Sequence, residues 1–130
     1  MSNSPSPTQA DQELFSEARA VADNAYAPYS GFHVGAALRT HAGKVYTGAN
    51  VENGSYPLGV CAERTVLSCA ASDGVRPGDI EAVAITASPC GGCRQWLLEF
   101  GVGRVVFAHA GGLQVRSTDE LLPHSFILDT

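Results

Sequence analysis

Three cysteines and one glutamate stand at spacings that suit a catalytic zinc site. Cys90 and Cys93 are separated by two residues, so both thiolates can reach one ion from a single turn of chain. Cys61 can supply a third sulfur, and Glu63 follows it closely. Three protein ligands leave one position of a tetrahedral zinc ion open for water, as in catalytic rather than structural sites. The motif therefore predicts that Glu63 moves the protons of that water.

The fourth cysteine, Cys69, is expected to lie outside this site. It stands eight residues after Cys61, which in a helix is about 12 Å along the axis. Zinc–sulfur distances are about 2.3 Å, so both sulfurs could bind one ion only if the helix broke. We interpret Cys69 as a small core residue. The histidines stand away from both motifs and are expected at the surface or in turns. They are His33, His41, His109 and His124.

Two arginines are expected to adjust the charge of the thiol cluster. Three thiolates outweigh the double positive charge of zinc and weaken it as a Lewis acid. Arg64 follows Glu63 and Arg94 follows Cys93, so both can donate hydrogen bonds to the sulfurs. Together with the positive ends of two helices, they would restore the acidity needed to ionise water near neutral pH.

A different class of function is compatible with part of this pattern. A pair of cysteines at the spacing of Cys90 and Cys93, at a helix start, is also typical of redox dithiols. A non-catalytic zinc or thiol-redox protein is therefore the alternative of another class. Cys61 and Glu63 at the head of a preceding helix favour the catalytic site. A structural zinc site would need a fourth ligand, which the distance to Cys69 excludes.

Length, charge and hydropathy limit the partners. The chain has 130 residues, which fits one domain. Its net charge of −5 disfavours a polynucleotide substrate, because acidic surfaces repel phosphate backbones. No apolar run approaches the roughly 18 residues of a membrane span, and no secretory signal is visible. We expect a cytoplasmic protein acting on a small molecule, with no nucleic acid polymer and no membrane among its partners.

The predicted elements alternate between helices and strands, which favours an α/β domain with a mixed five-stranded sheet. Residues 1–10 are expected to be a disordered tail and residues 11–130 a single catalytic domain. Ser88 is expected to cap a helix with Pro89 in its first turn. The predicted helices are residues 11–24, 61–72, 89–100 and 118–122, and the predicted strands are residues 34–40, 44–50, 81–86, 104–108 and 113–116.

Several segments together resemble the small cytidine deaminases. They are residues 26–37 (YAPYSGFHVGAA), 48–56 (GANVENGSY), 61–65 (CAERT), 88–95 (SPCGGCRQ) and 120–126 (ELLPHSF). The Cys-x-Glu form is similar to that of the homotetrameric branch, whereas other branches carry His-x-Glu.

This resemblance implies a three-layer α/β/α fold, one Zn²⁺ per chain and a homotetramer with a shared active site. The implied reaction is the hydrolytic deamination of cytidine and deoxycytidine to uridine and deoxyuridine with release of ammonia, a step of pyrimidine salvage.

The resemblance also implies substrate contacts. Asn50 and Glu52 match positions that hold the ribose 3′-hydroxyl, and a carboxylate there would repel a phosphate, which favours a nucleoside over a nucleotide. Phe32 matches an aromatic that packs by the substrate. The N–H of Ala62 and the loop of Tyr56 match other parts of the pocket.

Phe126 matches an aromatic supplied by a neighbouring subunit, which would tie activity to assembly. By residue type alone, Phe32 and Phe126 are equally compatible with a core position. The chain departs from the family in residues 80–89, which form a shorter segment than expected, and in the unusual Pro57-Leu58-Gly59 loop. That loop borders the ring pocket, so a blasticidin-S-type deaminase acting on a modified cytosine nucleoside is the second interpretation.

Overall fold

The computed structural model describes residues 5–128 and contains a five-stranded sheet with the order β2-β1-β3-β4-β5. β3 and β4 run parallel and all other neighbours are antiparallel, so the sheet is mixed. The strands are β1 (Gly35–Thr40), β2 (Val45–Ala49), β3 (Ile80–Ile85), β4 (Val105–His109) and β5 (Gly112–Arg116). The helices are α1 (Gln9–Ala22), α2 (Ala62–Ser72), α3 (Gly91–Glu99) and α4 (Thr118–Leu121), with a 3₁₀ turn at Tyr56–Leu58.

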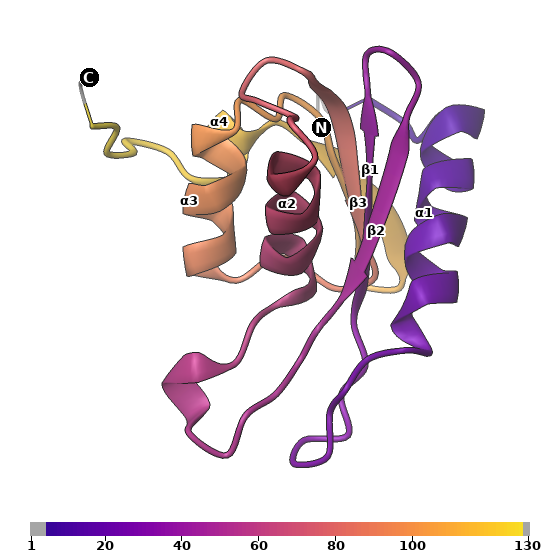
Figure 1. Ribbon diagram of the computed structural model, residues 1–130. Coiled ribbons are helices and arrows are strands. Elements are labelled where there is room, and N and C mark those ends of the chain that lie inside the picture. Colours follow the sequence, from indigo (N-terminus) through magenta and orange to yellow (C-terminus); the bar gives the residue numbers. More distant parts are fainter. Residues whose placement is uncertain (1–4, 129–130) are drawn as a thin grey trace.

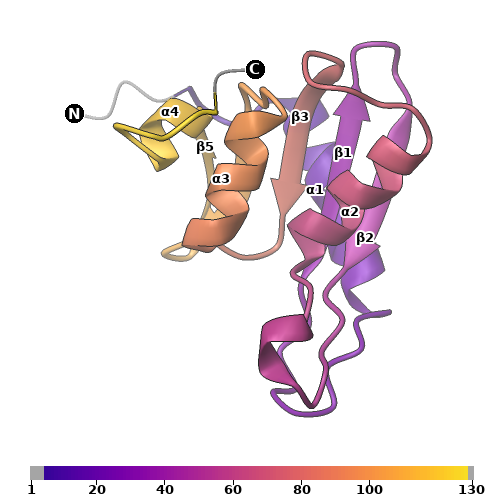
Figure 2. The same ribbon diagram turned by 60° about the vertical axis from the view of Figure 1, so that its left-hand side comes forward.

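Helices cover both faces of the sheet. Figure 1 shows α1 on one face and α2 and α3 on the other. In Figure 2, α4 lies beside α3. The predicted three-layer α/β/α fold with a mixed five-stranded sheet is confirmed. Among the described residues, no helix is long and apolar enough to cross a membrane.

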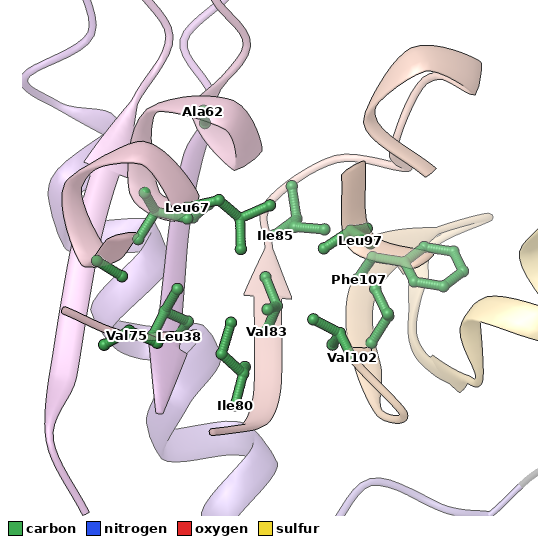
Figure 3. Packing of buried hydrophobic residues seen from close by; sticks show 14 of the residues in the cluster. Leu38, Ala62, Leu67, Val75, Ile80, Val83, Ile85, Leu97, Val102 and Phe107 are labelled. Atoms are coloured by element: carbon green, nitrogen blue, oxygen red, sulfur yellow. The ribbon is translucent and has the colours of Figure 1, made fainter. Parts of the chain in front are cut away.

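The larger core lies between the sheet and the pair α2 and α3 (Figure 3). Leu67 of α2 and Leu97 of α3 are fully buried there with Leu38 of β1 and Ile85 of β3. Burial of each side chain of this size contributes about 1.5–3 kcal/mol. This core therefore fixes α2 and α3, which carry both cysteine motifs, on the same face.

α1 lies close to the sheet because the residues between them are small. Ala18 of α1 packs in one cluster with Ala37 of β1 and Ala84 of β3. Gly35 lies directly beneath the helix, where a Cβ atom would stand 1.9 Å from the backbone oxygen of Ala18. The close approach of two backbones therefore requires glycine at this position.

Gly35→Ala is expected to lower the free energy of unfolding by about 3 kcal/mol or more, because α1 must move away from β1. Urea unfolding measures this change. Gly103→Ala is the matched control, because a Cβ atom there meets nothing within 4 Å. Equal stability of the two variants would show that α1 does not approach the sheet so closely.

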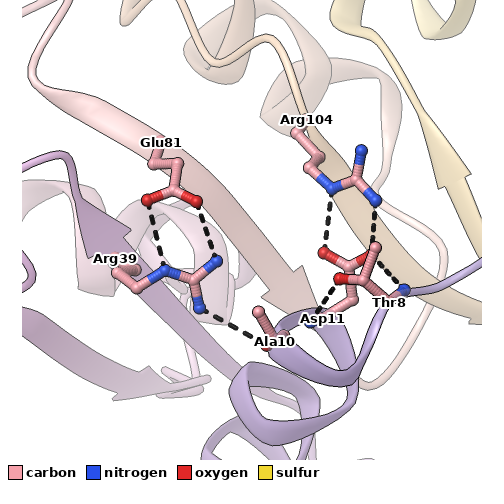
Figure 4. A network of polar contacts seen from close by, with 6 residues as sticks. All are labelled: Thr8, Ala10, Asp11, Arg39, Glu81 and Arg104. Atoms are coloured by element: carbon pink, nitrogen blue, oxygen red, sulfur yellow. Dashed lines mark hydrogen bonds and ion pairs between the residues drawn. The ribbon is translucent and has the colours of Figure 1, made fainter.

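A partly buried ion pair joins the start of α1 to the residue before β4 (Figure 4). Asp11 is 1 % exposed, and its Oδ1 accepts a hydrogen bond from Nε of Arg104 at 2.8 Å. Nη2 of Arg104 and the backbone N–H of Thr8 donate to Oδ2. The Thr8 hydroxyl in turn accepts from the Asp11 N–H, which completes a capping box. The first turn of α1 is thereby fixed to the sheet.

The hydrogen bond from Arg104 holds the pKa of Asp11 below its ordinary value. This pair therefore stabilises the fold fully above the unfolded-state pKa of about 3.9, and the contribution is lost as the pH falls through the lower folded-state pKa. Asp11→Asn is expected to cost about 2–3 kcal/mol at pH 7, and less as the pH falls below about 4.

Chemical unfolding across this pH range measures the effect. The control is Glu81→Gln, which removes the exposed ion pair with Arg39 and is expected to cost less than about 1 kcal/mol. If Asp11→Asn lowered the free energy of unfolding by the same amount at every pH, the stabilising role given to the ionised Asp11 would be contradicted.

Three predicted helix boundaries are wrong by two residues, namely the starts of α1 and α3 and the end of α1, which is Ala22 rather than residue 24. α1 begins at Gln9 rather than Asp11 because Thr8 caps it, so the predicted tail extends too far at residues 8–10, while residues 1–4 of that tail lie outside the described residues. α3 begins after Cys90 rather than at Pro89. The cap is Cys90 and not Ser88, because the Cys90 sulfur accepts a hydrogen bond from the N–H of Cys93 at 3.5 Å.

Candidate active site

Two helix starts bring three thiols together. Cys61 is the N-cap of α2, Cys90 is the N-cap of α3, and Cys93 lies in the first turn of α3. Their sulfurs all lie within 4.8 Å of one another, and those of Cys61 and Cys90 are 4.0 Å apart. Tetrahedral ligation with zinc–sulfur bonds of about 2.3 Å needs sulfurs about 3.8 Å apart. The three side chains therefore fit one zinc ion with little movement.

Cys69 lies outside this cluster, as the helical spacing predicts. The expectation that it is a core residue is wrong, because its side chain is exposed. Ala70, its neighbour on α2, faces the core instead. The metal group consists of three sulfurs, which leaves a tetrahedral ion one open position.

The environment of the thiols favours a bound cation. Burial raises the pKa of Cys93, and the charge of Glu63 raises it further. Burial also opposes ionisation of Cys90, but hydrogen bonds from Cys93 outweigh it and hold the pKa of Cys90 below its ordinary value. A coordinated metal ion deprotonates its thiol ligands outright. A bound zinc ion would therefore offset the cost that burial places on the Cys93 thiolate.

Glu63 lies in the first turn of α2 and is 4 % exposed. It lines a cavity of about 190 Å³ together with Cys61 and Cys90. Burial raises its pKa above the ordinary value of a glutamate. A buried carboxyl group whose pKa moves toward neutrality can both accept and donate a proton, as general acid–base catalysis requires.

Only one of the two arginines contacts a sulfur. Nη2 of Arg64 donates to the Cys61 sulfur at 3.4 Å, and its buried Nε has no hydrogen-bond partner among the described residues. Arg94 instead donates to the backbone oxygens of Pro89 and Leu121, at 2.9 and 2.8 Å. The expectation that Arg94 donates to a sulfur is wrong. It follows Cys93 directly and points about 100° away around the helix, toward α4.

Three of the predicted substrate contacts line the same cavity as Glu63. They are Phe32, Asn50 and Ala62. Glu52 and Tyr56 instead line an adjoining hollow of about 380 Å³ with Tyr29, Ser30, Asn53 and Gly59. A third hollow of about 260 Å³ contains residues of both groups, among them Asn50, Cys61, Glu52 and Tyr56.

Asn50 and Glu52 already make hydrogen bonds within the chain. Oδ1 of Asn50 accepts from the Val34 N–H at 2.8 Å, and its Nδ2 donates to the Phe32 oxygen at 2.8 Å. Oε1 of Glu52 accepts from the N–H groups of Tyr29 and Ser30 at 2.9 and 3.1 Å. The hydrogen bond from the Ser30 hydroxyl, the largest effect, holds the pKa of Glu52 below its ordinary value.

Phe126 does not line the cavity of its own chain. Its side chain is 68 % exposed in the segment after α4, and its backbone oxygen accepts a hydrogen bond from Nε2 of Gln95 at 2.8 Å. The residue is therefore free to contact another molecule.

The sequence analysis did not identify Val34 and Ala87 as lining residues of the cavity. β1 and β3 are antiparallel, and Ala36 pairs with Ile85. Val34, which precedes β1, therefore lies beside Ala87, which follows β3. Only the strand pairing brings these two residues together, since no spacing along the chain indicates it.

Comparison with known proteins agrees with this geometry. A family profile described as "Cytidine and deoxycytidylate deaminase zinc-binding region" matches residues 8–109. The chain belongs to this deaminase family. The matched region contains both helix starts and all three thiols of the cluster.

Individual deaminases of the family are similar over most of the chain. A cytidine deaminase of Sporosarcina psychrophila is 40 % identical over 124 residues, which cover 88 % of this chain and 90 % of that protein. A crystal structure of the cytidine deaminase from Burkholderia pseudomallei has a TM-score of 0.82 and 46 % identity, covering 88 % of this chain and 98 % of that one. That of the Mycobacterium tuberculosis enzyme has a TM-score of 0.78 and 40 % identity, covering 90 % of this chain and 97 % of that one.

Arg64→Ala is expected to weaken zinc binding by about tenfold or more, because groups that hydrogen-bond to metal ligands typically contribute this much. Competition with a zinc chelator of known affinity measures the effect. Arg94→Ala is the matched control and is expected to leave zinc affinity unchanged, since Arg94 bonds backbone oxygens. An unchanged zinc affinity in Arg64→Ala would remove Arg64 from the account of the metal site.

Proposed function

We propose that this protein is a zinc-dependent cytidine deaminase, which converts cytidine and deoxycytidine to uridine and deoxyuridine with release of ammonia. The observation that carries the proposal is the buried Glu63 in one cavity with Cys61 and Cys90 of the three-thiol cluster. The similar proteins and structures named cytidine deaminase, at 40–46 % identity, support the same substrate.

Cys61, Cys90 and Cys93 would hold a zinc ion, which would supply a Lewis acid that lowers the pKa of a water molecule. Glu63 takes one proton from that water and delivers it to the ring nitrogen beside C4. The water oxygen bonds to C4, the bond from C4 to the amine breaks, and the amine leaves as ammonia after Glu63 has passed it the second proton. The burial that raises the pKa of Glu63 supports this exchange of protons near neutral pH.

The remaining lining residues suit a nucleoside. The exposed ring of Phe32 can pack against the base, and the N–H of Ala62 lies at the start of α2, where backbone donors are free. Glu52 and Tyr56 border the adjoining hollow, where polar groups can bind sugar hydroxyls. Asn50 lines the cavity and holds the backbone of Phe32. The ionised Glu52 would repel a phosphate, which favours a nucleoside over a nucleotide.

The proposed active form is a homotetramer in which Phe126 completes the site of a neighbouring subunit. In support, Phe126, Ile127 and Leu128 form an exposed apolar run. Three of the four cysteines are assigned to zinc as thiolates, which a reducing compartment preserves, and we propose a cytoplasmic role in pyrimidine salvage.

The alternative functions are not favoured. A redox dithiol needs two thiols, whereas three sulfurs cluster here beside a buried carboxyl group. The relatives are named for cytidine, which speaks against a modified cytosine nucleoside as the main substrate.

The zinc-loaded protein is expected to convert cytidine to uridine. The change in ultraviolet absorbance measures this reaction, and ammonia release is an independent readout. Glu63→Ala is expected to lower kcat by about 10²–10⁴-fold or more, because it removes the proton-transfer group. Its zinc content is expected to stay at that of the wild type.

Glu17→Ala is the matched control, because Glu17 is an exposed glutamate on α1. Near-normal turnover by Glu63→Ala would contradict the role of Glu63. Absence of turnover by a zinc-loaded wild type, with a modified cytosine nucleoside accepted, would move the assignment to that substrate.

A further inference from the structure

Phe32 reaches the rim of the cavity from a segment without regular secondary structure. Residues 23–34 join α1 to β1, and the Phe32 side chain is 63 % exposed. An exposed aromatic ring on an irregular segment has no packing core to hold it. Its place beside the cavity must therefore come from hydrogen bonds to the backbone around it.

Two side chains that follow β2 supply most of these bonds. Asn50 bonds the Phe32 oxygen and the Val34 N–H. Glu52 accepts hydrogen bonds from the N–H groups of Tyr29 and Ser30. Backbone bonds from the Tyr26 N–H to Asn50 and from the Glu52 N–H to Tyr26 join the same two stretches.

The Ser30 hydroxyl links the carboxylate to the aromatic residue. It donates to Oε2 of Glu52, and it accepts from the Phe32 N–H at 3.0 Å. A charged acceptor polarises the hydroxyl, which strengthens both hydrogen bonds. A continuous chain of bonds therefore runs from Glu52 through Ser30 to the backbone of Phe32.

The bond from the Phe32 N–H to Ser30 taken alone is an ordinary local turn of the kind that serines form. The bond to Glu52 is of another kind, because the two residues are 22 positions apart in the chain. It also determines where the carboxylate points. Glu52 has about four acceptor positions, and the three bonds from Tyr29 and Ser30 leave about one of them for a ligand hydroxyl.

We infer that Ser30 is a positioning residue of the active site, whose hydroxyl sets Phe32 for the base and the free acceptor of Glu52 for a sugar hydroxyl. The inference rests on the proposed function, since it assigns Ser30 a share in binding the nucleoside. Ser30 does not line the cavity of Glu63 and is not part of the thiol cluster, so it is expected to act on binding rather than on the chemical step.

Steady-state kinetics with cytidine separate these effects. Ser30→Ala is expected to raise KM by about tenfold and to change kcat by less than about threefold, with an unchanged melting temperature. Ser30→Thr is expected to restore most of the loss, because it returns the hydroxyl. Ser68→Ala is the matched control, an exposed serine on α2 that lines none of the three hollows of the site.

Hydrogen exchange of residues 29–34 gives a readout that needs no turnover. The Phe32 amide is expected to exchange faster in Ser30→Ala, and at the wild-type rate in Ser68→Ala. An unchanged KM in Ser30→Ala, an equal rise of KM in Ser30→Thr, or unaltered exchange at Phe32 would overturn the inference. If the wild type did not deaminate cytidine, the proposed function would fail, and exchange at Phe32 alone would decide whether Ser30 holds the segment.

Discussion

The site depends on one constraint, which is that two helices must present their first residues to the same point on one face of the sheet. Cys61 and Cys90 cap α2 and α3, so a shift of either helix by one residue would remove a sulfur from the cluster. The core that includes Leu67 and Leu97 prevents such a shift. Helix N-termini also favour negative charge, which helps these positions to hold thiolates.

The same arrangement determines which groups face the metal. Glu63, two residues into α2, enters the cavity beside the sulfurs and is shielded from water. Arg64 stands one turn after Cys61 and donates to its sulfur, whereas Arg94 lies on another side of α3. The chemical groups thus come from rigid helices, and the groups proposed to bind substrate come from loops fixed by Asn50 and Glu52.

Much of this organisation could be predicted from the sequence. The order of helices and strands follows from periodicity, and the thiol cluster follows from the spacing of Cys90 and Cys93 with Cys61. The start of α1 was missed because the capping box of Thr8 overrides the polar composition around it. Cys90 was missed as a cap because a thiol is an uncommon capping group.

Long-range pairings could not be predicted from the sequence. The approach of α1 to Gly35, the ion pair of Asp11 with Arg104 and the link of Ser30 to Glu52 each join distant segments. The position of each partner is determined by the sheet register, which no local pattern encodes. The orientation of Arg94 likewise depends on where α4 packs.

X-ray absorption spectroscopy of the zinc-loaded protein tests the central claim most directly. The account predicts one zinc ion per chain with three sulfur neighbours at about 2.3 Å and one lighter neighbour, unchanged in Cys69→Ser. Loss of a sulfur neighbour is predicted for Cys61→Ser. A shell of four sulfurs, or a wild-type spectrum retained in Cys61→Ser, would contradict the account, because the open catalytic position would then not exist as described.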